Sequence, residues 1–259
     1  MTDNKKTKNT AKKKKFRNPL AVILTVLLVF LGIGVSFAGC LHLSHDKIIV
    51  AVDAAYGGEQ TGYTGIVNEA EFNEGVVNAL CARLADDDRF IVLRTHDAGT
   101  SRAILNIVRE INESRADLVL SIHAGYDPDP QKTGMHIYAE QPASDNHERS
   151  LELARSIQET FADDLSAEVN YMYYEPIGED RYQMKVVSEN DKNDYELATW
   201  TIMEKTLIPA VVTEQIYVSN EADVSAWANE EGYKKTAELY YRALCRYYGI
   251  DQRAAKPKN

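Results

Sequence analysis

The sequence predicts an α/β fold, a twisted and mostly parallel sheet of about six strands with helices on both faces. Between residues 46 and 250, apolar stretches of strand length alternate with longer stretches of helix length. The strand-like stretches are apolar throughout rather than at every second residue, which is typical of parallel strands buried on both faces. This alternation predicts βαβ units and therefore one α/β domain.

The first half of the domain alternates strictly between strand-like and helix-like segments. KIIVAVD has the continuous apolar character of a buried strand, and the segment after it repeats apolar residues with helical spacing at Val76, Leu80 and Leu84. Thr100 or Ser101 is the expected N-cap of the second helix. In chain order we expect a strand at 47–53, a helix at 70–87, a strand at 89–95, a helix at 101–115 and a strand at 117–123.

The second half contains the longest amphipathic segments and the weaker strand signals. Tyr171, Tyr173 and Tyr174 form an aromatic cluster, which we interpret as a surface loop, with a binding wall as the alternative. Residues 251–259 are polar and are expected to form a flexible tail. The expected elements are strands at 134–140, 182–188, 197–203 and 209–218, and helices at 147–165 and 229–249.

The N-terminal 43 residues have the composition of a membrane-targeting segment. Residues 1–18 hold eight Lys or Arg and one acid, and residues 19–43 hold no Asp, Glu, Lys or Arg. About 20 apolar residues span the ~30 Å hydrocarbon layer of a bilayer, and basic flanks stay in the cytoplasm. We expect a basic cytoplasmic tail, then either a membrane-spanning anchor or a lipoprotein signal ending at Cys40, with the domain on the extracytoplasmic face.

The charge of the rest of the chain argues against nucleic acid as a partner. Without residues 1–18 the chain keeps 21 of its 29 basic and 38 of its 39 acidic residues, a net charge of −17. Such a domain repels a phosphate backbone. Cys81 and Cys245 lie in helix-like segments and are expected to be buried; the sequence leaves open whether they form a disulfide.

Several residues able to do chemistry follow predicted strands. Asp53 and Tyr56 follow the first strand, His96 the second, and His123 ends the third, while Glu214 ends the strand PAVVTE. In parallel sheets these ends meet at one crevice, so we expect a metal site or an acid–base pair. The sequence contains no nucleotide-binding glycine motif, GxSxG, HExxH or CxxC, which argues against the corresponding sites.

The order of four segments resembles one enzyme family. IIVAVDAAYGG, NESRADLVLSIHAG, GMHIYA and PAVVTEQIYVSNEAD, spread over residues 47–249, are similar to zinc-dependent N-acetylmuramoyl-L-alanine amidases, which cleave peptidoglycan. SIHAG and PAVVTE with the following SN are the most specific pieces. The resemblance implies an amidase-like domain at 46–250, a zinc cofactor and peptidoglycan as the substrate; the sequence identifies no protein partner.

The resemblance also implies roles for individual residues. In the family, zinc is held by a His in the first glycine loop, a Glu at the start of the first helix and the His of the SIH strand end; a late-strand Glu acts on the water. His123 and Glu214 match the last two positions. Glu74 is the expected helix ligand because Asn78 follows four residues later, and Glu71 is the alternative.

Tyr56 stands where the family has its loop His. A phenol must lose a proton to bind zinc, which costs roughly 4 kcal/mol at pH 7 from an unperturbed pKa of about 10. Zinc binding is therefore expected to be weakened. Three outcomes are open. Tyr56 binds zinc as a phenolate, or His96 replaces it as the ligand. In the third, the site holds no zinc and Tyr56 donates a hydrogen bond to a sugar or peptide. Asp53 either orients the loop or only bonds its own turn.

Three hypotheses follow. The first is a membrane-anchored zinc amidase that hydrolyses the bond between N-acetylmuramic acid and L-alanine. The second is a catalytically degenerate relative that binds cell wall glycopeptide or a partner enzyme. The third sets the resemblance aside and leaves an outward-facing α/β domain that binds a small ligand.

Overall fold

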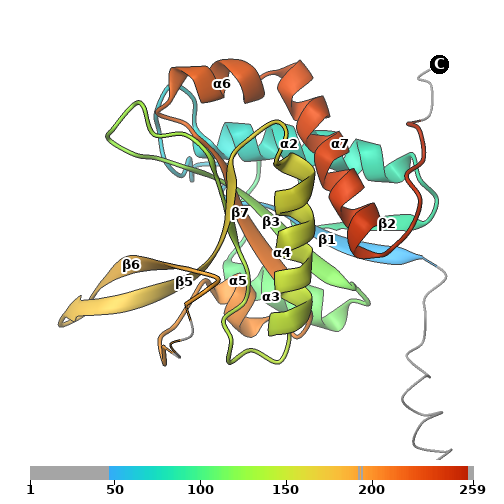
Figure 1. The fold of residues 1–259 in the computed structure, drawn as a ribbon. Helices are drawn as coiled ribbons and strands as arrows, with labels where there is room; N and C mark the ends of the chain where they lie inside the picture. The colour runs from blue at the N-terminus through green and yellow to red at the C-terminus, as the bar shows by residue number, and fades with distance from the viewer. Residues whose placement is uncertain (1–46, 192, 194, 256–259) are drawn as a thin grey trace, which may run out of the picture. The chain divides into compact units, whose positions relative to one another are not determined.

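The computed structural model describes residues 47–191, 193 and 195–255, which form one mixed sheet covered by helices (Figure 1). The predicted α/β class is confirmed, with seven strands in place of about six, in the order β2-β1-β3-β7-β4-β5-β6. Strands β2, β1, β3 and β7 are mutually parallel. Strand β4 is antiparallel to β7, β5 is parallel to β4, and β6 is antiparallel to β5.

The element bounds agree with most of the predicted segments. The strands are β1 (Ile48–Ala54), β2 (Phe90–Arg94), β3 (Leu118–Gly125), β4 (Met135–Tyr138), β5 (Ala167–Gly178), β6 (Arg181–Ser188) and β7 (Ala210–Tyr217). The helices are α2 (Glu69–Ala85), α3 (Ile104–Glu113), α4 (His147–Phe161), α5 (Thr201–Lys205), α6 (Glu221–Trp227) and α7 (Glu230–Tyr247).

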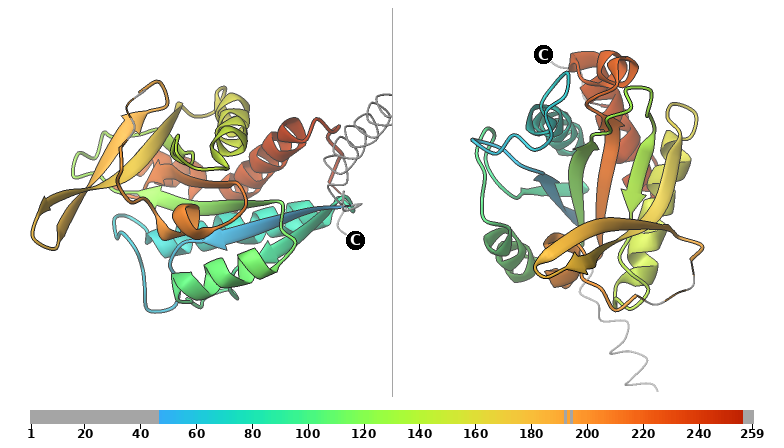
Figure 2. Two further views of the ribbon diagram at one scale, coloured as in Figure 1. Left: turned by 90° about the horizontal axis from the view of Figure 1, so that it is seen from below. Right: turned by 90° about the vertical axis from the view of Figure 1, so that its left-hand side faces the viewer.

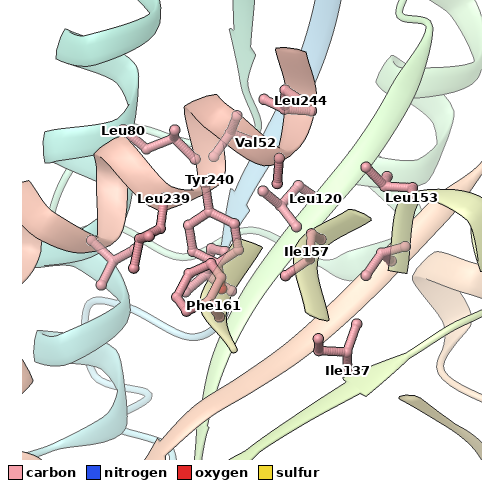
Figure 3. Packing of buried hydrophobic residues seen from close by; sticks show 14 of the residues in the cluster. Val52, Leu80, Leu120, Ile137, Leu153, Ile157, Phe161, Leu239, Tyr240 and Leu244 are labelled. Carbon is pink, nitrogen blue, oxygen red and sulfur yellow. The ribbon is translucent and has the colours of Figure 1, made fainter. Parts of the chain in front are cut away.

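Successive residues of the strands point into two separate cores. Val50 and Val52 of β1 pack with α2, α4 and α7, whereas Ala51 packs with α3 and α5. In the left panel of Figure 2, α3 lies on one side of the sheet and α4 and α7 lie on the other. In the larger core, Leu120 lies near Ile157, and Tyr240 of α7 lies against Phe161 of α4 (Figure 3).

Three local predictions were wrong, and one helix was missed. Residues 197–203 were expected to form a strand, but they lead into the short helix α5, which buries Ile202 and Met203. The tyrosine cluster lies in β5 rather than in a surface loop. Helix α6, capped by the Asn220 side chain on Asp223 N (2.9 Å), was missed. Helix α3 has Ala103 as its N-cap instead of Thr100 or Ser101, because the Thr100 hydroxyl bonds Asp97 O in the preceding turn.

The expected basic tail (1–18), the membrane-spanning or signal segment (19–43) and Cys40 lie outside the described residues. Within the described part of the chain, no helix is long and apolar enough to cross a bilayer. Arg253, in the expected C-terminal tail, donates its backbone N–H to the Tyr241 hydroxyl (2.6 Å). Cys81 and Cys245 are free thiols in the structure.

A buried carboxyl outside the crevice makes stability depend on pH. Glu140 is 1% exposed and accepts hydrogen bonds from Ala210 N and the Ser144 hydroxyl. Burial raises the pKa of Glu140 from 4.5 to about 7. The raised pKa means that the folded state favours the neutral form of Glu140. The contribution of this group to the free energy of unfolding is therefore complete below pH 4.5 and is lost as pH rises through 7.

Glu140→Gln is therefore expected to flatten this part of the pH profile. Between pH 4.5 and pH 8 the free energy of unfolding of the original chain should fall by about 3 kcal/mol relative to the variant. Urea denaturation of both proteins at the two pH values measures the difference. Parallel profiles would show that Glu140 titrates near its ordinary pKa.

Candidate active site

The site lies at the carboxyl ends of the parallel strands, on the sheet face that α3 and α5 cover. In the parallel register of β3 and β7, His123 pairs with Glu214, so the two residues are neighbours about 4.8 Å apart along the sheet. Val119 on β3 and Val212 on β7, whose side chains share this face, belong to the core on the α3 and α5 side. The structure thus brings together the two strand-end residues that the sequence singled out.

Glu69, the first residue of α2, is the carboxylate that reaches His123. Its Oε1 accepts from His123 Nδ1 (3.0 Å) and lies 3.4 Å from Ala124 N, while Oε2 accepts from Tyr63 N (3.0 Å). The side chain is 1% exposed. Gly62 allows the loop to pass this closely, because a Cβ there would lie 2.5 Å from Glu69 Oε2 and the backbone φ is +64°. Both oxygens of Glu69 are thereby fixed in position.

Glu74 and Glu71 do not occupy the place expected for the helix ligand. Glu74 pairs with Arg94, whose Nη2 lies 2.7 and 2.8 Å from its two oxygens, and Asn78 Oδ1 accepts from the same guanidinium. Five residues of helix separate Glu74 from Glu69 by about 7.5 Å and turn its side chain away. Glu71 is exposed. The Asn four residues after the helix Glu is Asn73, which donates to Ala55 O of the glycine loop (2.9 Å).

Glu214 is half-buried and lies beside a tyrosine. The Tyr138 hydroxyl donates to Glu214 Oε2 (2.8 Å), which leaves Oε1 as the second acceptor. Burial raises the pKa of Glu214, against the lowering effects of the Tyr138 hydrogen bond and of His123 and His136. His136 is the β4 neighbour of Glu214 and bonds the Tyr217 hydroxyl through Nε2 (2.9 Å). A buried carboxyl with a raised pKa is suited to proton transfer near neutral pH.

Trp200 supports the site from the segment that the sequence analysis assigned to a strand. Its indole stacks on the His123 ring, with centroids 5.7 Å apart and planes at 22°. The same indole meets Tyr138 edge-on, with centroids 4.8 Å apart. Trp200 therefore contacts both the imidazole and the phenol that holds Glu214. The sequence shows only an isolated Trp in an apolar run and gives no signal for this position.

Asp53 and His96 hold the loops behind the site. Asp53 accepts from the hydroxyls of Thr95 (2.6 Å) and Ser121 (2.7 Å). The ring nitrogens of His96 bond two backbone carbonyl groups, Nε2 with Ala54 O (2.8 Å) and Nδ1 with Asp97 O (3.1 Å). Both residues line a cavity of about 400 Å³ that Tyr56, His123 and Trp200 also line. Because both ring nitrogens already bond backbone carbonyl groups, His96 is placed to fix the loop after β1 rather than to take the place of Tyr56 as a zinc ligand.

Tyr56 lies edge-on to His123 in a left-handed backbone conformation. Its φ is +67°, unusual for a bulky residue, and its ring centroid lies 5.9 Å from that of His123. The side chain is 42% exposed. Partial burial of the side chain and the negative charge of Glu69 raise its pKa to about 12. The phenol thus keeps its proton over the physiological range.

Two side chains, Glu69 and His123, are spaced as two ligands of one zinc ion would be. Two tetrahedral ligands of one zinc ion lie about 3.3 Å apart, close to the 3.0 Å between Glu69 Oε1 and His123 Nδ1. A metal ion held by these atoms would take the place of the proton they share. Within the described ranges no three His, Cys, Asp or Glu side chains gather in a way that could hold a metal. Tyr56, whose ring lies edge-on to His123, stands where the family has its loop His.

Comparison with known sequences gives a match over most of the domain. A family model described as N-acetylmuramoyl-L-alanine amidase matches residues 50–246, more than half of the chain. No curated protein sequence is similar enough to the chain to match it.

Several solved structures share the fold. The catalytic domain of CwlV, an N-acetylmuramoyl-L-alanine amidase from Bacillus (Paenibacillus) polymyxa var. colistinus, is 19% identical with a TM-score of 0.63, covering 79% of this chain and 100% of its own. Ami1 from Mycobacterium smegmatis is 17% identical (TM-score 0.60; 80% and 99%). The CwlD amidase of Clostridioides difficile, solved in complex with the GerS lipoprotein, is 17% identical (0.60; 79% and 100%). At these identities the likeness shows a common fold.

Proposed function

Because the chain belongs to the N-acetylmuramoyl-L-alanine amidase family, a family of hydrolases, we propose that it hydrolyses the amide between N-acetylmuramic acid and L-alanine in peptidoglycan. The observation that carries this proposal is the arrangement of Glu69, His123 and Glu214 at one end of the sheet. Two carboxylates and an imidazole in one crevice supply what amide hydrolysis needs, a proton acceptor and groups that orient the attacking water and the amide carbonyl.

Glu214 is the residue that moves the proton. Its Oε1 takes a proton from the attacking water and returns it to the nitrogen of L-alanine as the amide bond breaks. The Tyr138 hydroxyl holds Oε2 and so fixes the carboxylate plane. Trp200 keeps His123 and Tyr138 in their relative positions by contacting both rings.

His123 and Glu69 are the residues that would hold zinc, and Tyr56 is the third donor beside them. When bound, zinc acidifies a water molecule and polarises a carbonyl group. Because Tyr56 replaces an imidazole by a phenol of raised pKa, we propose that zinc binds this chain more weakly than a site with two imidazoles.

The same feature supports a second candidate function. If Tyr56 excludes zinc, the crevice is a binding site for cell wall glycopeptide or a docking site for a partner enzyme. Exposed and protonated, the phenol of Tyr56 can donate a hydrogen bond to a sugar or peptide oxygen.

Incubation of the full chain with purified peptidoglycan separates the two functions. Hydrolysis creates one new N-terminal L-alanine for each bond cleaved, and mass spectrometry identifies the released stem peptides. We expect release that increases with added zinc and stops with a chelator. Sedimentation of the chain with insoluble wall, without any release, would support the binding function instead.

We further propose that the domain lies on the extracytoplasmic face of the membrane, tethered through residues 19–43. The charge asymmetry of the N-terminal segment supports this orientation. Protease added to intact spheroplasts should digest the domain, and protection would contradict the orientation. The mass of the membrane-extracted N-terminus distinguishes a lipidated Cys40 from a retained anchor.

A further inference from the structure

The hairpin formed by β5 and β6 has an uncharged, apolar side that is exposed. Side chains of Met172 and Val186, Tyr174 and Met184, and Pro176 and Tyr182 lie opposite each other in the antiparallel register and therefore share one face. Tyr182, Met184 and Val186 are 64%, 47% and 40% exposed. Apolar residues left exposed together on one strand typically mark a binding surface.

The opposite side of the hairpin carries the charges. Lys185 Nζ pairs with Glu175 Oε1 (3.0 Å), and Gln183 donates to the other oxygen of the same carboxylate (2.7 Å). Tyr173 on this side is fully buried in the larger core. The apolar side therefore faces away from the larger core, and its exposed β6 residues Tyr182, Met184 and Val186 belong to neither hydrophobic core.

The exposed apolar side is continuous with the active site. Met172, on this side of β5, belongs to the core beneath the site. Tyr174 lines the cavity of His123 and Tyr56. Met184 and Val186 line a second cavity of about 210 Å³ together with Glu214. The hairpin projects beyond the sheet in Figure 1 and crosses in front of β7 in the right panel of Figure 2.

Two stacked tyrosines also line the second cavity. Tyr63 and Tyr126 stack with centroids 5.9 Å apart, and both are exposed. The charged residues that line this cavity besides Glu214 are Asp127 and Lys132, and His136 also lines it. Beside Glu214, this cavity is therefore lined mainly by aromatic and apolar side chains, and on the hairpin it is lined only by Met184 and Val186.

We propose that the apolar side of the β5–β6 hairpin binds the glycan strand of the substrate, an inference that rests on the proposed function. Sugar rings and N-acetyl methyl groups are neutral and present C–H faces that pack on tyrosine and aliphatic side chains. A stem peptide carries free carboxylates, which an uncharged face has no group to bind. The apolar side of the hairpin therefore suits the glycan, while the peptide extends in another direction from Glu214.

The test measures glycan binding in a chain that cannot cleave. In a Glu214→Gln background, isothermal titration with chitotetraose, a neutral N-acetylglucosamine tetramer without peptide, is compared between two variants. Tyr182→Ser/Met184→Ser should raise the Kd at least 10-fold. Gln183→Ser, an exposed change on the other side of the same strand, should change it less than 2-fold. Val186→Thr preserves the side-chain shape and is a second variant if the double variant is unstable.

Three results would overturn the proposal. The first is no binding of chitotetraose by the parent chain, and the second is an equal loss of affinity in the double variant and in Gln183→Ser. The third is that the double variant abolishes self-association of the chain and leaves glycan binding unchanged. The last result would identify the hairpin as a protein interface. Because chitotetraose contains no muramoyl–alanine amide, glycan binding without stem-peptide release would reject the proposed hydrolysis and leave the hairpin proposal intact.

Discussion

Glu214→Gln is expected to lower the rate of stem-peptide release by about 10²- to 10⁴-fold, the range typical for removal of a general base. The amide has nearly the shape of the carboxylate and can still accept the Tyr138 hydrogen bond, so the pocket should keep its structure. An amide nitrogen cannot take a proton from water at neutral pH. The loss should therefore appear in kcat with little change in binding of the wall, measured by release and by sedimentation with peptidoglycan.

Glu140→Gln is the matched control for this experiment. It makes the same change to a buried Glu that lines a separate cavity away from Glu214 and His123. Its release rate should stay within a factor of two of the original. In the parent chain, kcat/KM should fall with acid at a pH above the ordinary pKa of a Glu, because burial raises the pKa of the base that must be ionised. Release by Glu214→Gln within 3-fold of the parent would exclude Glu214 as the base.

Most of the fold is predictable because its strands are buried on both faces. Continuous apolar runs such as those of β1 and β3 have few alternatives in a soluble domain. Strand β5 was missed because its buried part mixes tyrosines with Asn170, a composition also found in loops. The segment before α5 was misassigned because a short apolar run has no periodicity long enough to separate helix from strand.

The site could be predicted where position along a strand determines it. His123 and Glu214 end parallel strands, and parallel strand ends meet. The helix Glu depends instead on where α2 begins, and helix ends are the least certain part of a sequence prediction. Asn68 directly before Glu69, and Asn73 four residues after it, were the available signals. These two residues support Glu69 as the helix ligand at least as well as Asn78 supports Glu74.

Other parts of the site depend on contacts that no local pattern records. Trp200 reaches His123 across the sheet face from 77 positions further along the chain, and Tyr138 reaches Glu214 from an antiparallel neighbour. The apolar side of the hairpin is visible in sequence only after the register of β5 and β6 is known. These features belong to the tertiary structure, so they could be found only once the strands had been paired.

Tyr56→His is expected to raise the affinity for zinc by about 10³-fold and to raise stem-peptide release with it. At pH 7 even a phenol of ordinary pKa gives up about three pKa units, or roughly 4 kcal/mol, to become a ligand, whereas imidazole is already neutral. The pKa of Tyr56 is raised further, to about 12, so the 10³-fold gain is the smallest that we expect. Glu69 and His123 are already 3.0 Å apart, so the new side chain would complete a set of three ligands. The left-handed conformation at position 56 is no obstacle, because His adopts it more readily than bulky residues do.

Zinc content after dialysis, measured by inductively coupled plasma mass spectrometry, gives a result independent of catalysis. Tyr63→His is the matched control, since Tyr63 is an exposed tyrosine of the same loop that stacks on Tyr126 instead of meeting His123. Stoichiometric zinc in the parent chain that Tyr56→His weakens would show that the phenolate is a ligand. If neither variant retains more zinc than the parent chain, Glu69 and His123 do not bind zinc together. Their contact would then be a hydrogen bond and not part of a metal site.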